Sequence, residues 1–359
     1  MGSLTSSLLS RRRLVWAVPA VTAAAIAGAV LVPLNSSATV HPKLPPRTAA
    51  QLLAAVQGSS GTALSGTVVE TARLGLPSLP MADASASLDW QSLIVGSHSA
   101  RVWVDGQDRQ RVGLLGTLSE AEVIHNGRDV WTYTSRTNQV THQTLSPDAT
   151  GTDHPDATDK YTPQGAADAA LKAIDPTTRV SVDDTQKVAG RSAYVITLTP
   201  KDARSTVERV TIALDSVHYV PLRVQVFGSA ARPAIEVGFT DVTFARPEAS
   251  LFRFRAPAGA TTTNDPLGVG RDGERNSTPE QAAPSSVVIG SGWTTIVELP
   301  SGAAGAQMPG LLDKLTKVQP DGSRRLTTSL VNALLTKDGR VFVGAVSPAA
   351  LAQAAQTHR

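Results

Sequence analysis

The 359-residue chain contains no cysteine, and aromatic residues make up only 4% of it. The absence of cysteine excludes a disulfide framework, a thiol nucleophile, a cysteine-ligated zinc ion and a lipid-modified N-terminal cysteine. The net charge is also small. Arg11, Arg12 and Arg13 are the only charged residues before position 40, and the rest of the chain holds equal numbers of basic and acidic groups. Such a neutral body lacks the electrostatic footprint of a protein that binds nucleic acid.

The common catalytic motifs are absent as well. The sequence has no G-x-S-x-G elbow, no H-E-x-x-H pair and no Walker loop, which favours a protein that is not an enzyme and needs no cofactor. Gly268, Gly270 and Gly273 match the dinucleotide-binding fingerprint in spacing, but they lie in a stretch rich in Gly and Ser rather than between a strand and a helix. An extracytoplasmic hydrolase remains a further alternative.

Two groups of residues resemble the ligand sets of metal ions. His125 and His142 fall near opposite ends of one predicted hairpin, but no third ligand accompanies them, so we interpret them as core or surface histidines. A polar loop near position 150 lacks the ligand pattern of an EF-hand, and we interpret it as solvated. Its candidate ligands are Asp148, Asp153, His154, Asp156 and Asp159. No metal site is predicted.

The N-terminus has the pattern of an export signal. The three arginines precede an uncharged, mostly apolar run over residues 14–34, and Ser36 to Ala38 offer a small-residue cleavage site. Because about 20 apolar residues can span a bilayer, the segment could also stay uncut as an anchor with its first residues in the cytoplasm. The alternative is a buried helix of a cytosolic fold. We therefore predict that residues 1–38 are a signal peptide or membrane anchor, and that the protein is extracytoplasmic, either anchored or secreted.

The exported part alternates between short helices and many strands. Thr48 and Gln51 have capping-box spacing ahead of an apolar stripe, which predicts a helix over residues 48–57. A second helix is predicted over 163–174, with Thr162 as its cap, and a short one near 88–95. Most other segments from position 63 to 258 repeat apolar residues with a period of two between Gly, Asp and Asn turns, which is typical of antiparallel strands.

A change in composition predicts a second domain. Residues 261–286 are rich in Gly, Pro, Ser and Thr and nearly free of apolar residues, so we interpret them as a flexible linker. Beyond it, a predicted helix over 309–318, strands around the Asp338-Gly339 turn and an alanine-rich end indicate a small α+β domain over 287–359. Residues 39–260 then form the large domain.

Several motifs of the large domain, taken in order, resemble a known family. They are VAGRSAYVITLTPKDARSTVERVTIALDSVHYVPLRVQVFG, VGFTDVTF and SLFRFRAPAGA, preceded by RVWVDG, DRQRV and GRDVWTY. Together they are similar to the LolA lipoprotein carriers and to the N-terminal domain of the envelope-stress regulators of the RseB (MucB) type. The resemblance implies an α+β fold in which a strongly curved antiparallel sheet, an incomplete β-barrel, is closed by helices over an apolar cavity.

The family resemblance and the strand pattern together predict where a ligand would bind. Alternation places apolar pairs of four strands on single faces, and Trp131 and Tyr133 are candidates for a container wall or for a partner-binding edge. The predicted cavity residues are Val102, Val104, Val112, Leu114, Trp131, Tyr133, Ile196, Leu198, Val224 and Val226. The predicted ligand is a lipid or the acyl chain of a lipoprotein. The alternative is an RseB-like protein that binds the extracytoplasmic part of a membrane regulator such as an anti-sigma factor.

Overall fold

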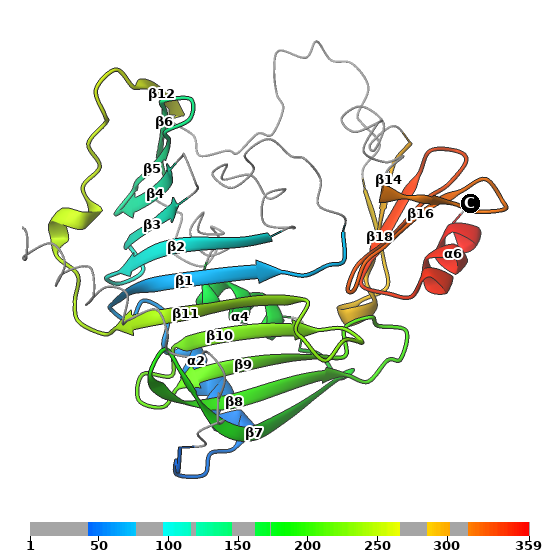
Figure 1. The fold of residues 1–359 in the computed structure, drawn as a ribbon, viewed down its shortest axis with the longest axis horizontal. Coiled ribbons are helices and arrows are strands. Elements are labelled where there is room, and N and C mark those ends of the chain that lie inside the picture. The colour runs from blue at the N-terminus through cyan, green and yellow to red at the C-terminus, as the bar shows by residue number, and fades with distance from the viewer. Residues whose placement is uncertain are drawn as a thin grey trace, which may run out of the picture. The chain divides into compact units, whose positions relative to one another are not determined.

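A large, mostly antiparallel sheet dominates the fold (Figure 1). The computed structural model describes residues 42–76, 96–115, 120–145, 162–172, 174–265, 286–301 and 315–358. The strands of this sheet are β1 Leu64–Ala72, β2 Gly96–Val104, β3 Arg109–Leu115, β4 Glu120–Asn126, β5 Asp129–Thr134, β6 Gln139–Thr144, β7 Thr178–Val188, β8 Arg191–Pro200, β9 Arg209–Asp215, β10 Pro221–Phe227, β11 Ile235–Thr243 and β12 Thr261–Asp265. Their spatial order is β12-β6-β5-β4-β3-β2-β1-β11-β10-β9-β8-β7, so β7 and β12 are the two edges and the sheet is not closed.

Three interruptions of the strand register accompany the bending of this sheet. They lie between β1 and β11, between β9 and β10, and between β7 and β8. In the first, Thr67 pairs with Asp241 and the next residue, Val68, pairs with Phe239, so that Thr240 is an extra residue in β11. Such bulges bend the strand and increase its twist. The predicted curved, incomplete barrel is confirmed.

Two predicted helices form on one side of the sheet. Helix α2, Ala49–Gln57, begins with the expected capping box, in which the Gln51 backbone N–H donates to the Thr48 hydroxyl at 3.2 Å and the Thr48 N–H donates to the Gln51 side chain at 3.0 Å. Helix α4, Pro163–Lys172, is capped by Thr162, whose hydroxyl accepts from the Gly165 N–H at 3.1 Å. Both helices therefore begin where the sequence predicts. The predicted helix near 88–95 lies outside the described residues.

The start of the predicted linker is part of the large sheet. Thr261–Asp265 pairs in parallel with β6 as β12, with Thr261 opposite Gln139. Three consecutive threonines favour an extended strand because their branched side chains fit a pleated surface, and the polar composition of the segment concealed this. The rest of the predicted linker up to residue 285, including Gly268, Gly270 and Gly273, lies outside the described residues.

The C-terminal residues form a second, six-stranded sheet. Its order is β13-β14-β18-β17-β16-β15, and helix α6, Pro348–Thr357, packs on it through Leu351. Its strands are β13 Val287–Ile289, β14 Ile296–Leu299, β15 Lys317–Val318, β16 Arg324–Thr327, β17 Asn332–Leu335 and β18 Val341–Gly344. Most of the predicted 309–318 helix lies outside the described residues, and its last two residues are strand β15.

Loops of the second sheet contact the ends of strands in the large one. The Trp293 indole N–H donates to the Thr178 hydroxyl at 2.7 Å, and the Ser329 N–H donates to the Leu74 carbonyl at 3.0 Å. Leu330 is 3% exposed and joins a hydrophobic cluster that contains Leu74 and side chains of β8–β10. The small sheet therefore packs against the large one and shares part of its hydrophobic core.

Among the described residues, no helix has the length and apolar character needed to cross a bilayer. The apolar run over residues 14–34 lies outside them.

Candidate functional site

The face of the large sheet that α2 and α4 cover is called the inner face here. Helix α2 contributes Leu52 and Val56, and α4 contributes Ala167, to a cluster with the apolar side chains of β8, β9 and β10. Strand register then assigns every other residue of the neighbouring strands to this face, because successive side chains of a strand alternate. On β1 the inner residues are Leu64, Gly66, Val68, Glu70 and Ala72.

One line of directly opposed residues crosses seven strands of the inner face. Starting at the β7 edge, its first five members are apolar and its last two, on β1 and β2, are titratable. We call this line the Glu70 row. Its members are Val182, Ile196, Ile212, Val224, Val237, Glu70 and His98. The row therefore changes from apolar to polar at β1.

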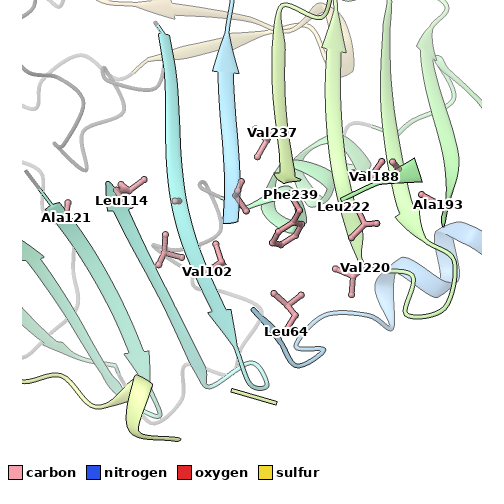
Figure 2. Close-up of a cluster of buried hydrophobic side chains, with 14 residues drawn as sticks. Leu64, Val102, Leu114, Ala121, Val188, Ala193, Val220, Leu222, Val237 and Phe239 are labelled. Carbon is pink, nitrogen blue, oxygen red and sulfur yellow. The ribbon is translucent and has the colours of Figure 1, made fainter. Parts of the chain in front are cut away.

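Eight of the ten predicted cavity residues lie on the inner face, in two groups. Around β2 and β3, Val102 and Val112 are paired with each other and each is 1% exposed, as Figure 2 shows for Val102 near Leu64 and Phe239. Leu114 is 6% exposed in the same cluster, and Val104 packs against it. Around β8 to β10, the second cluster contains Ile196, Leu198 and Val224, with Val226 at its border. The strands thus bring the members of each group together as the alternation predicts.

Trp131 and Tyr133 lie on the opposite, outer face. Trp131 pairs with Ile124 and His142, whereas its neighbour Thr132 pairs with Val123 on the inner face. The indole is stacked on the His142 ring at 3.8 Å and on the Phe254 ring at 5.0 Å between centroids. The pairing therefore places these two aromatic residues on the opposite side of the sheet from the eight aliphatic ones. The ten predicted residues do not line one cavity together.

A chain segment that follows β11 covers this part of the outer face. It includes the 3-10 turn η3, Ala249–Phe252, which contacts β3 and β4. The Arg111 guanidinium donates to the Leu251 carbonyl at 2.9 Å and to the Glu122 carboxylate at 2.6 Å. Burial raises the pKa of Glu122, although the Arg111 charge opposes the rise. Arg111 thus ties the segment to the sheet.

Two pockets border these elements. One of about 300 Å³ lies between the η3 segment and the sheet, where Arg111, Glu122 and Phe254 line it. The other, of about 550 Å³, lies at the ends of β2 and β4 and is lined by Asp105 and Arg246 among others. Hydrogen bonds from Arg246 and the charge of Arg109 keep the pKa of Asp105 below its ordinary value. Neither pocket is lined by any of the eight aliphatic residues.

Glu70 is the residue that sequence reasoning missed. It lies on the inner face between Val68 and Ala72, opposite Val237 on one side and His98 on the other. Burial raises the pKa of Glu70 from 4.5 to about 7. The signal was present in the sequence LSGTVVETA, because Glu70 falls in the same alternation phase as Leu64 and Val68 and a charged residue breaks an otherwise apolar or small series.

The two candidate histidines lie on opposite faces of the sheet. His125 lies on the inner face of β4 and contacts the Gly127 carbonyl at 2.8 Å, whereas His142 lies on the outer face and contacts Asp129 at 2.8 Å. Within the described ranges, no group of three or more His, Asp or Glu side chains could hold a metal ion. The acidic loop of residues 148–159 lies outside those ranges.

Comparisons with known proteins find likeness only among solved structures. No family model and no curated protein matches the chain. The complex of MucA and MucB from Pseudomonas aeruginosa contains a chain that is 16% identical, with 84% of this chain and 95% of that chain covered and a TM-score of 0.41. An uncharacterized conserved protein from Thermus thermophilus is 14% identical, covering 60% and 99%, with a TM-score of 0.35.

A LolA superfamily protein from Nitrosomonas europaea is 12% identical, covering 58% and 99%, with a TM-score of 0.24. The solved structures that this chain resembles thus include a complex with MucB and a LolA superfamily protein. Likenesses of this strength carry no argument about function, and the site must be judged from its own side chains.

Proposed function

We propose that this chain is an extracytoplasmic, non-catalytic binding protein that holds an acyl chain between the inner face and the two covering helices. The ligand would be a lipid or the acylated end of a lipoprotein. The observation that carries the proposal is the apolar part of the Glu70 row, five directly opposed aliphatic side chains on β7 to β11. They form one continuous apolar path across the strands rather than isolated patches.

The length of this path suits an acyl chain. Neighbouring strands are about 4.8 Å apart, so five strands extend over roughly 19 Å, and curvature shortens the concave side. One leaflet of a bilayer core is about 15 Å thick. Each buried methylene contributes about 0.8 kcal/mol, so a chain of a dozen methylenes retains several kcal/mol after the costs of association.

Helix α4 is suited to act as a displaceable cover. The side chains it directs at the core are Ala166, Ala167, Ala170 and Leu171. A buried alanine methyl contributes about 0.8 kcal/mol, against about 1.5–3 kcal/mol for a fully buried leucine or valine. An acyl chain of a dozen methylenes that replaced α4 on the sheet would therefore bury more apolar surface than the three alanines and the one leucine do together.

Photo-crosslinking tests the location of the ligand. A fatty acid with a diazirine near its end is added to the purified full chain, and the labelled residues are mapped by mass spectrometry. We expect labels on inner-face residues of β8 to β11 such as Val224 and Val237. Labels confined to outer-face positions such as Gln225 and Glu236, or no labelling at all, would overturn the proposal.

The absence of cysteine makes the movement of α4 directly measurable. Ala167→Cys would be the only thiol of the chain, on a side that is fully buried, and Ala169→Cys would be the matched control on the exposed side of the same helix. We expect a fatty acid to raise the rate at which a maleimide labels position 167 and to leave position 169 unchanged. Equal rates with and without fatty acid at position 167 would contradict a moving cover.

Export and the domain division are further parts of the proposal. The charged and apolar pattern up to residue 34 supports extracytoplasmic location, and external protease should digest the protein in intact cells once the outer layers are permeabilised. A resistant cytosolic pool would refute export. Limited proteolysis should cut first within residues 266–285 and leave the large domain folded, with β12, Thr261–Asp265, still part of it. Earlier cleavage inside 163–258 would refute the division.

The second candidate is a regulator-binding protein of the RseB type, and the small sheet favours it. Strand β13 pairs on one side only among the described residues, and Val287 and Val288 are 46% and 64% exposed. A partner could add an extended segment to such an edge. A photo-crosslinking amino acid at Val288, with Lys337 as the control position, should capture a membrane protein. The purified extracytoplasmic part of that membrane protein should then bind the purified chain. Failure of that binding would exclude this candidate.

A further inference from the structure

We propose that the inner face selects an amphiphile with an amine head group, whose ammonium pairs with Glu70 while its alkyl chain follows the apolar part of the Glu70 row. This inference rests on the proposed function, because it specifies the head group of the ligand that the inner face would hold.

Among the described residues, the Glu70 carboxylate differs from the other buried or half-buried acids of the large sheet, each of which has a partner. The Asp215 carboxylate accepts hydrogen bonds from Arg191, Glu122 pairs with Arg111, and Asp105 pairs with two arginines. No hydrogen bond or ion pair joins the Glu70 carboxylate to any residue in the described part of the chain, and burial is the sole cause of its raised pKa. A carboxylate that loses water without gaining a partner is destabilising, so its presence on this face indicates a ligand group.

The surroundings of Glu70 define what that group must be. Its neighbours on the same face of β1 and β11 are aliphatic, with Val68 at 1% and Val237 at 7% exposure. The titratable groups of the adjoining elements are His98 on β2 and, on α4, Asp168 and Lys172. Asp168 is itself half-buried, accepts from Gln164 at 3.0 Å, and has a raised pKa because of burial.

An ammonium head group satisfies the Glu70 carboxylate best. Hydrogen bonds between two charged groups are roughly twice as strong as neutral ones, and an ammonium also cancels the charge that burial disfavours. A hydroxyl head supplies the hydrogen bond without the charge, and an ionised fatty acid head supplies neither. The apolar part of the row runs from β7 to β11, and Glu70 on β1 comes directly after it. An amine bound at Glu70 therefore directs its alkyl chain towards β7.

The test compares three amphiphiles of equal chain length on the purified full chain. Dodecylamine, dodecanol and dodecanoic acid compete with an uncharged fluorescent apolar probe, at several pH values. At about pH 8.5 the amine is charged, as lysine is, and Glu70 is ionised. We expect the amine to bind about tenfold more tightly than the alcohol, which is the ratio that one charge-assisted hydrogen bond gives. The ratio should fall towards one as the pH drops below 7 and Glu70 is protonated.

Two variants separate the role of Glu70 from a general effect of charge. Glu70→Gln should bring the amine-to-alcohol ratio close to one at every pH, because the glutamine amide keeps a hydrogen-bond acceptor but carries no charge. Glu236→Gln is the matched control, because Glu236 is a half-buried acid on the outer face of the adjacent strand, where it accepts from Gln225 at 3.0 Å. It should leave the ratio unchanged.

The outcomes distinguish this inference from the proposed function. If the wild-type chain binds the amine and the alcohol equally, prefers the fatty acid, or keeps its preference for the amine in Glu70→Gln, the head-group inference is wrong and the acyl-binding function stands. If none of the three amphiphiles displaces the probe, the proposed function itself fails.

Discussion

Replacing Glu70 with glutamine should stabilise the protein above neutral pH and have almost no effect near pH 4. Burial raises the pKa of this carboxyl from 4.5 in the unfolded chain to about 7 in the folded protein. Between these values the folded protein holds a proton that the unfolded chain has released. The favourable contribution is therefore complete below the unfolded pKa and is lost as the pH rises through the folded pKa. Glutamine has nearly the same shape and is neutral at every pH.

The magnitude follows from the two pKa values. Their difference corresponds to about 3 kcal/mol once both states are ionised, and partial access of the carboxyl to solvent reduces the expected gain to about 1–3 kcal/mol. The assay is urea unfolding of Glu70→Gln and the wild type at a series of pH values, followed by tryptophan fluorescence. The difference in unfolding free energy should grow from near zero at about pH 4 to its full value above about pH 8.

Glu236→Gln, on the outer face, controls for the loss of one negative charge and should show no such growth with pH. A Glu70→Gln variant that is destabilised above neutral pH would refute the reasoning, because it would mean that the carboxylate has a stabilising partner. A difference that is constant with pH would equally refute it, because the carboxyl would then not titrate between pH 4.5 and 7.

Three further predictions concern the framework. Asp215→Asn should destabilise the fold by about 3–5 kcal/mol at neutral pH, since the fully buried carboxylate accepts from Arg191 at 2.5 Å. Although burial raises the pKa of Asp215, its hydrogen bonds outweigh burial and lower it below the ordinary 3.8. The loss in urea unfolding should therefore shrink as the pH is lowered below that ordinary value, and a pH-independent loss would contradict the charge argument. Gly66→Ala should lower the unfolding free energy by about 1–3 kcal/mol, because the added methyl would overlap the Asp241 carbonyl oxygen first and the Phe239 ring next. An unchanged melting temperature would show that the backbone of β11 at the bulge can move. Gly228→Ala would overlap the backbone of the second sheet, so hydrogen exchange should rise first at the contact between the sheets, and uniform exchange would argue against that contact.

Alternation within a strand could be predicted from the sequence, but register between strands could not. The pattern around Val102 and Val112 predicts which residues share a face of their own strand, and the structure pairs these two directly. Whether Trp131 lies on the same face depends on how β5 is aligned with β4. The turn at Gly127 sets that alignment, which the pattern of either strand alone does not determine. The same limit applies to β12, whose parallel pairing with β6 joins residues more than 110 positions apart.

Glu70 illustrates a different limit. Its position in the alternation of β1 indicates the inner face, but a charged residue at such a position is equally compatible with a strand end or a bulge. Only the pairing with Val237 and His98 shows that Glu70 stands at the end of an apolar row on the inner face. The sequence therefore predicts the apolar face of the sheet more readily than the carboxyl group that lies on it.

The extra residue Thr240 in β11 has a consequence for which changes this protein can tolerate. Thr240 is exposed, and its hydroxyl donates to the Thr67 carbonyl at 3.2 Å, so substitutions at this position disturb little. Deleting the residue would have a different effect. Phe239 and Val242 would then lie two positions apart in an unbroken strand, so both would stay on the inner face, but the bulge and the bend that it gives β11 would be lost. Related chains that lack this residue should therefore keep the same side chains on the inner face of a less curved sheet.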